Sequence, residues 1–113
     1  MIRETLDSGS VYFSLFVMGG SNGLSKQWRT CYGCITYGDI NASVDGRNTG
    51  LRVTKIGNTF QAYFKIFGSD DWVPLGSAET LEFSPWSDMF DVGIAVTSND
   101  NSKTAELSWS SNW

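Results

Sequence analysis

Clusters of turn-forming residues interrupt this chain at short intervals, and they constrain its fold more than any other feature. Gly, Asn, Asp and Ser favour tight turns. They gather in residues 7–10, 19–23, 38–50, 57–58, 68–71, 84–88 and 98–102. The runs between them are short and rich in Val, Ile, Phe, Tyr, Thr and Trp, and none holds a helical apolar period. Short strands between turns predict an all-β fold, an antiparallel sandwich or barrel, formed as a single domain by residues 1–113.

Apolar and polar side chains alternate along several of these runs, as they do on a strand with one buried face. In NTFQAYFKIF, one face bears Phe60, Ala62, Phe64 and Ile66, and the other bears Gln61, Tyr63 and Lys65. The same pattern places these polar residues on the outward faces of two further runs: Ser25, Gln27, Arg29, Arg52 and Thr54. The sequence therefore predicts strands with an apolar inner face and an outer face that bears Gln, Arg, Thr and Tyr.

The run MFDVGIAVTS differs from the others because both of its faces lack large polar side chains. Phe90, Val92, Ile94 and Val96 share one face, and small Gly and Ala residues occupy part of the other. A strand that is apolar or small on both faces is typical of the centre of a sheet. We therefore predict a central strand here.

The charge balance excludes two classes of partner. The chain has 8 Lys and Arg against 12 Asp and Glu, a formal net charge of −4, and its basic residues are scattered. Nucleic acids and anionic lipid surfaces require clustered Lys and Arg, and no apolar run approaches the ~20 residues that span a bilayer. We therefore expect no nucleic-acid partner and no membrane partner.

The two cysteines, Cys31 and Cys34, stand in the segment WRTCYGCITYG. A β-turn brings its first and fourth Cα atoms within about 7 Å, and a disulfide needs a separation of about 4.4–6.8 Å. A reduced pair is the alternative, because oxidation requires an extracellular compartment. A thioredoxin-like motif needs a helix, and a structural zinc site needs four ligands. We predict a disulfide that staples a turn, and with it an extracellular or secreted protein.

Catalytic chemistry has little support in this sequence. The chain contains no His, which removes Ser-His-Asp and Cys-His catalysis and most transition-metal sites. A glycosidase needs two carboxylates in one cleft, and the odd spacing of Glu79 and Glu82 places them on opposite faces of a strand. Asn99, Asp100 and Asn101 offer oxygen ligands for calcium, although we prefer a turn in which they bond their own backbone. We therefore predict that the protein is not an enzyme and holds no cofactor and no metal.

Four segments resemble those of a known family, in the same order: MIRETLDSGS, NGLSKQWRT, GLRVTKIGNTFQAYFKIFGSDDWVPLGS and VGIAVTSNDNSKTAELSW. They are similar to the DUF1349 (regulation-of-enolase-like) type of concanavalin A-like jelly-roll domain, which includes modules attached to bacterial carbohydrate-active enzymes. The resemblance covers nearly the whole chain and implies a two-sheet antiparallel β-sandwich. The chain departs from the family at Lys26, where an aromatic or aliphatic residue is usual.

Members of that family carry further strands before the position that matches Met1. A sandwich without them would leave backbone groups unpaired at a sheet edge and apolar residues uncovered. Three outcomes are open: a fragment of a longer protein, a smaller closed sandwich, or an incomplete sandwich completed by a neighbouring chain through strand addition.

Sugars present patches of C–H groups, which aromatic faces cover, and hydroxyls, which directed polar groups bind. The ligand-binding residues that we predict are Gln27, Arg29, Tyr32, Arg52, Gln61, Tyr63 and Trp86. Tyr32 and Trp86 stand in loops, whereas the other five lie on outward strand faces, and the family resemblance implies that these five gather on one sheet. An ordinary solvated face explains the same five residues equally well.

Together these features favour a non-catalytic, lectin-like carbohydrate-binding module whose partner is a glycan or polysaccharide. The alternative is a structural subunit that assembles with copies of itself through an incomplete sheet edge. On either reading we expect a homo-oligomer.

Overall fold

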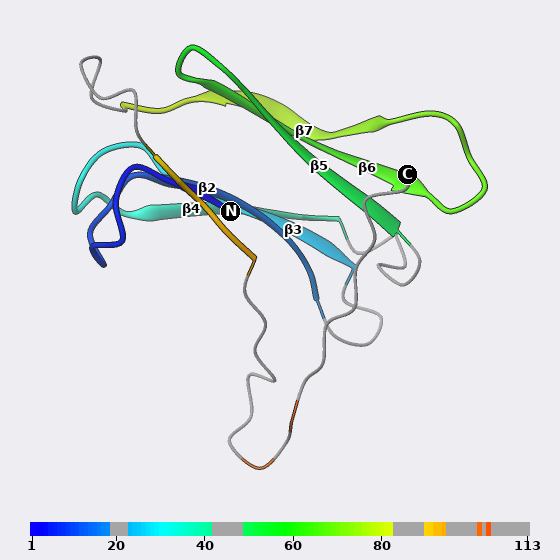
Figure 1. Ribbon diagram of the computed structural model, residues 1–113, viewed down its shortest axis with the longest axis horizontal. Coiled ribbons are helices and arrows are strands. Elements are labelled where there is room, and N and C mark those ends of the chain that lie inside the picture. Colours follow the sequence, from blue (N-terminus) through cyan, green and yellow to red (C-terminus); the bar gives the residue numbers. More distant parts are fainter. Residues whose placement is uncertain (19–22, 42–48, 83–89, 95–101, 103, 105–113) are drawn as a thin grey trace.

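The computed structural model describes residues 1–18, 23–41, 49–82, 90–94, 102 and 104. Over these residues the fold is all-β, and its strands form two antiparallel sheets that lie as separate layers (Figure 1). The prediction of a two-sheet antiparallel β-sandwich is thereby confirmed. Among the described residues there is no helix long and apolar enough to cross a membrane.

One sheet has five strands, in the order β4-β3-β2-β1-β8. Its members are β1 (Ile2–Arg3), β2 (Tyr12–Val17), β3 (Leu24–Arg29), β4 (Thr36–Asn41) and β8 (Asp91–Val92). The other sheet has three strands in the order β5-β6-β7, namely β5 (Thr49–Ile56), β6 (Thr59–Ile66) and β7 (Val73–Thr80). Turns join β5 to β6 and β6 to β7 at two of the predicted clusters, residues 57–58 and 68–71, whereas the turn from β3 to β4 lies at the cysteine pair. The predicted turn region 38–50 was too long, because β4 continues to Asn41 and β5 begins at Thr49.

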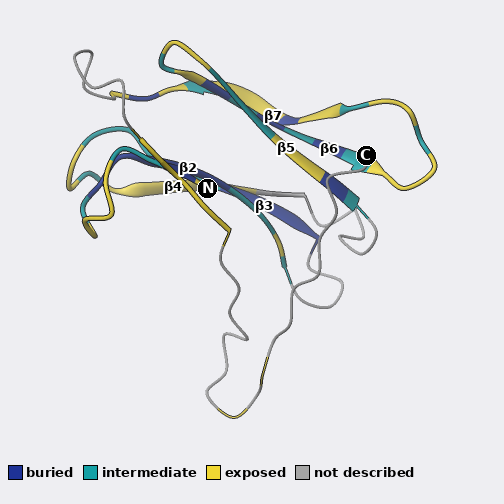
Figure 2. Ribbon diagram, viewed as in Figure 1, coloured by how far each residue is buried: buried dark blue, intermediate teal, exposed yellow. Residues whose placement is uncertain are grey.

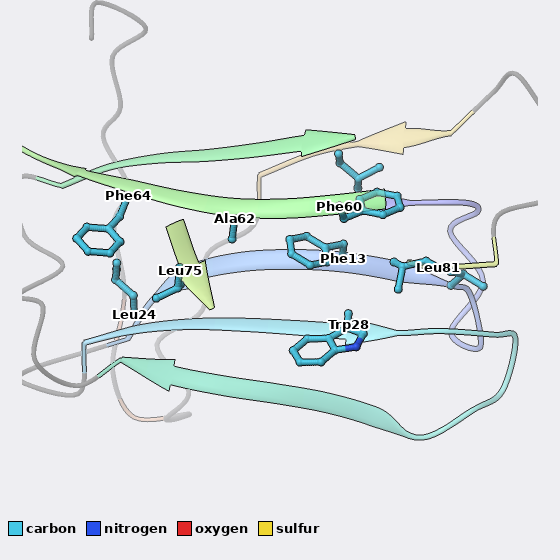
Figure 3. Close-up of a cluster of buried hydrophobic side chains, with 10 residues drawn as sticks. Phe13, Leu24, Trp28, Phe60, Ala62, Phe64, Leu75 and Leu81 are labelled. Atoms are coloured by element: carbon cyan, nitrogen blue, oxygen red, sulfur yellow. The ribbon is translucent and has the colours of Figure 1, made fainter. Parts of the chain in front are cut away.

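The core lies between the two sheets and is built from the inward faces of both. Phe13 of β2 stacks on Phe60 of β6, with 5.5 Å between ring centroids (Figure 3). The other buried apolar side chains around them are Ile2, Val11, Leu24, Trp28, Ala62, Phe64, Leu75 and Leu81. Burial of this set removes apolar surface from water, which is the main force that holds the layers together.

Strand β6 shows the predicted alternation most clearly. Phe60, Ala62 and Phe64 are buried, whereas Gln61 and Tyr63 between them are half-buried on the opposite face (Figure 2). The alternation ends at the strand terminus, where Ile66 is exposed even though it continues the apolar series. Periodicity thus predicts the face of each residue, while burial also depends on what the facing sheet covers.

Strand β7 contains an irregularity opposite β6. Glu79 pairs with Phe60 and Leu75 pairs with Ala62, so β7 has extra residues between these two pairs. Gly76 lies in this bulge with φ +69°, a conformation that glycine adopts without strain. The bulge directs the backbone carbonyls of residues 76 and 77 toward two side chains described below.

The prediction of a central strand over residues 90–96 is not borne out by residues 90–94, the part of this run that the structure describes. Strand β8 pairs with β1 alone and ends the order of its sheet in the described part of the chain, and Phe90, Val92 and Ile94 are exposed. Because β1 has only two residues, it offers β8 a short ladder. Small residues show that little space is filled on one face; they do not show that a strand lies on both sides.

Candidate functional site

The predicted ligand-binding residues do not gather on one sheet. Gln27 and Arg29 lie on β3 of the five-stranded sheet, whereas Arg52, Gln61 and Tyr63 lie on β5 and β6 of the three-stranded sheet. The expectation of a single sheet was therefore wrong. Alternation of side chains decides which face of a strand is outward, but it contains no information on which strands pair. Trp86 and the segment 99–101 lie outside the described residues.

The outer face of the three-stranded sheet is defined by its cross-strand pairs. Arg52 pairs with Tyr63, and Thr54 pairs with Gln61. Directly opposed residues of an antiparallel pair point to the same face, and the alternate residues of β6 are buried in the core. Arg52, Thr54, Gln61 and Tyr63 therefore point away from the core.

Arg52 lies between two aromatic rings on this face. Its guanidinium carbon is 5.9 Å from the centroid of the Tyr63 ring and 5.8 Å from that of Trp72, which precedes β7. The ammonium of Lys65 is also 5.8 Å from the Trp72 ring. Among the described residues, the guanidinium of Arg52 makes no hydrogen bond and no ion pair. We name Arg52, Gln61, Tyr63 and Trp72 the Arg52 face.

Gln61 adds a directed polar group to the Arg52 face. Its Nε2 donates to the carbonyl of Ala62 at 3.0 Å and to the carbonyl of Gly76 in the β7 bulge at 3.3 Å. These bonds orient the amide so that, in the described part of the chain, its Oε1 receives no hydrogen bond. Trp72 was not among the site residues predicted from the sequence, because a Trp beside a hairpin turn is expected to pack at the start of its strand.

The turn between β3 and β4 has the disulfide that the sequence predicts. Cys31 and Cys34 are bonded, with 5.3 Å between their Cα atoms. The amide of Cys34 donates to the carbonyl of Cys31 at 3.1 Å, and Gly33 takes φ +71° inside the turn. Tyr32 stands at the tip and is 68% exposed.

The ring of Tyr32 lies flat against Gly9. A Cβ atom added to Gly9 would be 2.8 Å from Cζ and 3.1 Å from both Cε atoms of Tyr32, so the glycine faces the ring and not its edge. The Tyr32 hydroxyl donates to Oδ1 of Asp7 at 3.0 Å. The amide of Gly9 donates to the same oxygen at 2.9 Å, and that of Gly33 donates to the Gly9 carbonyl at 2.9 Å.

These bonds shift two pKa values in opposite directions. The amide of Gly9 and the hydroxyl of Tyr32 hold the pKa of Asp7 below its ordinary value, because both hydrogen bonds favour the carboxylate. The bond to Asp7 raises the pKa of Tyr32, because it favours the protonated phenol. At neutral pH the pair is a phenol that donates to a carboxylate.

Arg29 uses its guanidinium within the fold. Its Nε donates to the carbonyl of Cys34 at 2.9 Å, and Nη1 donates to the carbonyls of Ser8 at 2.7 Å and Ser10 at 3.2 Å. Its Nη2 donates to Oγ1 of Thr36 at 3.3 Å. Arg29 thus ties the stapled turn to residues 8–10, which positions Tyr32 against Gly9.

Gln27 lies half-buried on the outer face of β3, next to Gly38 of β4. A Cβ at Gly38 would be 3.4 Å from Cγ of Gln27, so the glycine leaves room for this side chain. Within the described residues, the Gln27 amide makes no side-chain hydrogen bond. It is therefore separate from both the Arg52 face and the Tyr32 turn.

Lys26 points inward between the sheets, and its side chain is 0% exposed. Its ammonium donates to the carbonyl of Ser77 at 2.6 Å and to Oε1 of Glu79 at 3.2 Å, both on β7. It lies 3.6 Å from Oδ2 of Asp39 on β4 and 4.6 Å from the Trp28 ring centroid. The sequence signal was Lys26 itself, at an inward position of β3; its partners are distant in the sequence and could not be inferred.

Comparison of the chain with family models, curated proteins and solved structures finds no match in any of the three. The similarity to DUF1349-type domains thus stays an expectation. Among the described residues, no three His, Cys, Asp or Glu side chains are grouped so as to hold a metal ion.

Proposed function

We propose that this protein is a non-catalytic carbohydrate-binding module and that it binds a glycan or polysaccharide on the Arg52 face. The observation that carries the proposal is the guanidinium of Arg52, held between Tyr63 and Trp72 without a hydrogen-bonding partner among the described residues. Its five N–H donors are thereby oriented and left for a ligand.

The chemistry of this face suits a sugar. Aromatic rings such as those of Tyr63 and Trp72 offer apolar surface to the C–H groups of a pyranose. Donors on Arg52 and the acceptor Oε1 of Gln61 then bind the hydroxyls, which both donate and accept. An open sheet face can follow an extended polymer, and the proposal needs no deep cavity.

Two of the carboxylates that the structure describes are engaged within the fold and do not lie on the Arg52 face. A glycosidase places an acid and a second carboxylate on either side of the scissile bond. Asp39 and Glu79 both contact the ammonium of Lys26 between the sheets, away from the outer Arg52 face. A disulfide is typical of an oxidising compartment, so the proposal includes an extracellular or secreted location.

Affinity electrophoresis in gels that contain xylan, mannan, laminarin, hydroxyethyl cellulose or polygalacturonate tests this function. We expect retention by at least one polymer, and a dissociation constant about tenfold or more weaker in Arg52→Ala and Tyr63→Ala. Thr54→Ala is the matched control, because Thr54 also points outward from β5. Absence of retention by every polymer would refute the function, and equal retention of all variants would refute the site.

A second function, self-assembly, is favoured by inward-facing residues that remain uncovered. Leu51 and Val73 both pair with buried Phe64, and Val92 pairs with buried Ile2, yet all three are exposed. A neighbouring copy of the chain that covered them would remove apolar surface from water. Light scattering at several concentrations tests this proposal, which predicts a mass above that of the monomer; a monomer at every concentration would overturn it.

A further inference from the structure

We propose that the Tyr32 turn is a second, independent sugar-binding site, so that one chain binds two glycan segments at once. The inference rests on the proposed carbohydrate-binding function and extends it. The site consists of the Tyr32 ring as a stacking surface and Asp7 as an acceptor for sugar hydroxyls, and its ligand class is a neutral pyranose ring.

The ring of Tyr32 has one covered face and one open face. Gly9 lies against the covered face, close enough that even a methyl group would collide with the ring. The residue is nevertheless 68% exposed, so the opposite face meets solvent. A flat, open aromatic face at a turn tip is the surface that the C–H side of a pyranose can cover.

The ring is also held in one orientation before any ligand arrives. The disulfide fixes the turn, the hydroxyl is bonded to Asp7, and the amide of Gly33 is bonded to the carbonyl of Gly9. An ordered side chain loses little conformational entropy when a ligand binds, which favours affinity. A tyrosine that served only to cover the core would not need an exposed face.

Asp7 supplies the polar part of this site. Its Oδ1 accepts hydrogen bonds from Gly9 and Tyr32, whereas its Oδ2 accepts none among the described residues. The lowered pKa of Asp7 keeps it a carboxylate at neutral pH. A carboxylate oxygen next to an aromatic face can accept a hydrogen bond from a hydroxyl of the sugar that stacks on that face.

The two sites belong to different sheets. The Tyr32 turn joins β3 to β4 in the five-stranded sheet, and the Arg52 face belongs to β5, β6 and the residue before β7. In Figure 1 the cyan turn after β3 and the yellow-green turn between β6 and β7 lie at opposite ends. One sugar ring cannot contact both sites, so two binding sites per chain follow.

Isothermal titration calorimetry with xylohexaose, cellohexaose, laminarihexaose and mannohexaose tests the inference through the number of sites per chain. We expect two sites in the wild type and one in both Tyr32→Ala and Gly9→Ala. The second variant keeps the tyrosine but displaces its ring, because the new Cβ would be 2.8 Å from Cζ. Gly93→Ala is the matched control and should keep two sites, because nothing lies within 4 Å of its added Cβ.

Other results separate the inference from the proposed function. If the wild type has one binding site per chain and Tyr32→Ala keeps it, the proposed second site is overturned and the Arg52 face stands. Two sites that survive both Tyr32→Ala and Gly9→Ala would also overturn it. One site that disappears with Tyr32→Ala would overturn both the two-site inference and the Arg52 face. Absence of binding to all four hexasaccharides would overturn the inference together with the function.

Discussion

Lys26 is the residue whose placement departs most from simple alternation. It occupies an inward position of β3, between buried Leu24 and Trp28, and its ammonium reaches β7 of the facing sheet. Removal of an ammonium from water is costly unless partners replace the lost hydration. Ser77, Glu79 and Asp39 supply those partners, so the contact depends on the whole group and not on Lys26 alone.

Substitution of Lys26 or of Glu79 should therefore have unequal effects on the free energy of unfolding. Glu79→Ala leaves a buried ammonium with fewer partners and should destabilise by about 1–3 kcal/mol, whereas Lys26→Met removes the charge and should change stability by less than about 1 kcal/mol. Urea denaturation of both variants measures this difference. A larger loss in Lys26→Met than in Glu79→Ala would contradict the account.

The bond between Tyr32 and Asp7 should be detectable through the titration of Tyr32. The bond raises the pKa of Tyr32. Its contribution to the stability of the folded protein is therefore complete below the usual tyrosine pKa of about 10, and it is lost as the pH rises through the raised value. The same bond lowers the pKa of Asp7. The contribution of Asp7 to the stability of the folded protein is therefore complete above about pH 3.9, and it is lost as the pH falls through the lowered value.

We expect Asp7→Ala to lower the pKa of Tyr32 toward the ordinary tyrosine value. Nuclear magnetic resonance of the Tyr32 ring between pH 8 and 12 or so, around the usual pKa, measures it. An unchanged Tyr32 titration in Asp7→Ala would show that the two side chains are not bonded in solution.

Among the elements, the β7 bulge links the interior to the Arg52 face. The carbonyl of Ser77 accepts from Lys26 on the inner side, and the carbonyl of Gly76 accepts from Gln61. Gly76 combines φ +69° with close neighbours: an added Cβ would be 3.0 Å from Cε and Nζ of Lys26. The bulge therefore needs glycine for its backbone conformation and for space.

Gly76→Ala should destabilise more than Gly57→Ala. Gly57 has a similar φ of +59°, but nothing lies within 4 Å of its added Cβ. Both substitutions strain the backbone by about 1–3 kcal/mol, and only that at Gly76 also displaces Lys26. Thermal unfolding of the two variants compares them directly; equal losses would mean that the contact with Lys26 contributes nothing.

The elements also show what the sequence could and could not predict. The faces of β6 and the disulfide turn depend on local spacing, and both were predicted. The division of β3 and β5 between different sheets, the pairing of β8 with β1 and the contacts of Lys26 with β7 depend on strands distant in the sequence, and spacing contains no signal for them. Arg52, Gln61 and Tyr63 were therefore assigned to the correct face but grouped with residues of another sheet.

At the scale of the whole molecule, the two sheets are joined by an apolar core and by the contacts of Lys26, while their other surfaces differ in character. The Arg52 face presents aromatic rings and a guanidinium that makes no hydrogen bond or ion pair with the residues that the structure describes. The Tyr32 turn presents one fixed ring at the end of the other sheet. Both surfaces combine aromatic rings with polar groups, and the proposed binding of sugars depends on that combination.

Our main proposal is that the outer face of the three-stranded sheet binds a glycan. Its most direct test is a nuclear magnetic resonance titration of the labelled protein with the four hexasaccharides, in which the side-chain signals of Arg52, Gln61, Tyr63 and Trp72 are followed. If this face binds a glycan, these signals should shift saturably with at least one sugar, and Arg52→Ala should bind that sugar more weakly. If these four signals do not shift with any sugar, or if only the signals of other residues shift, the proposal is contradicted.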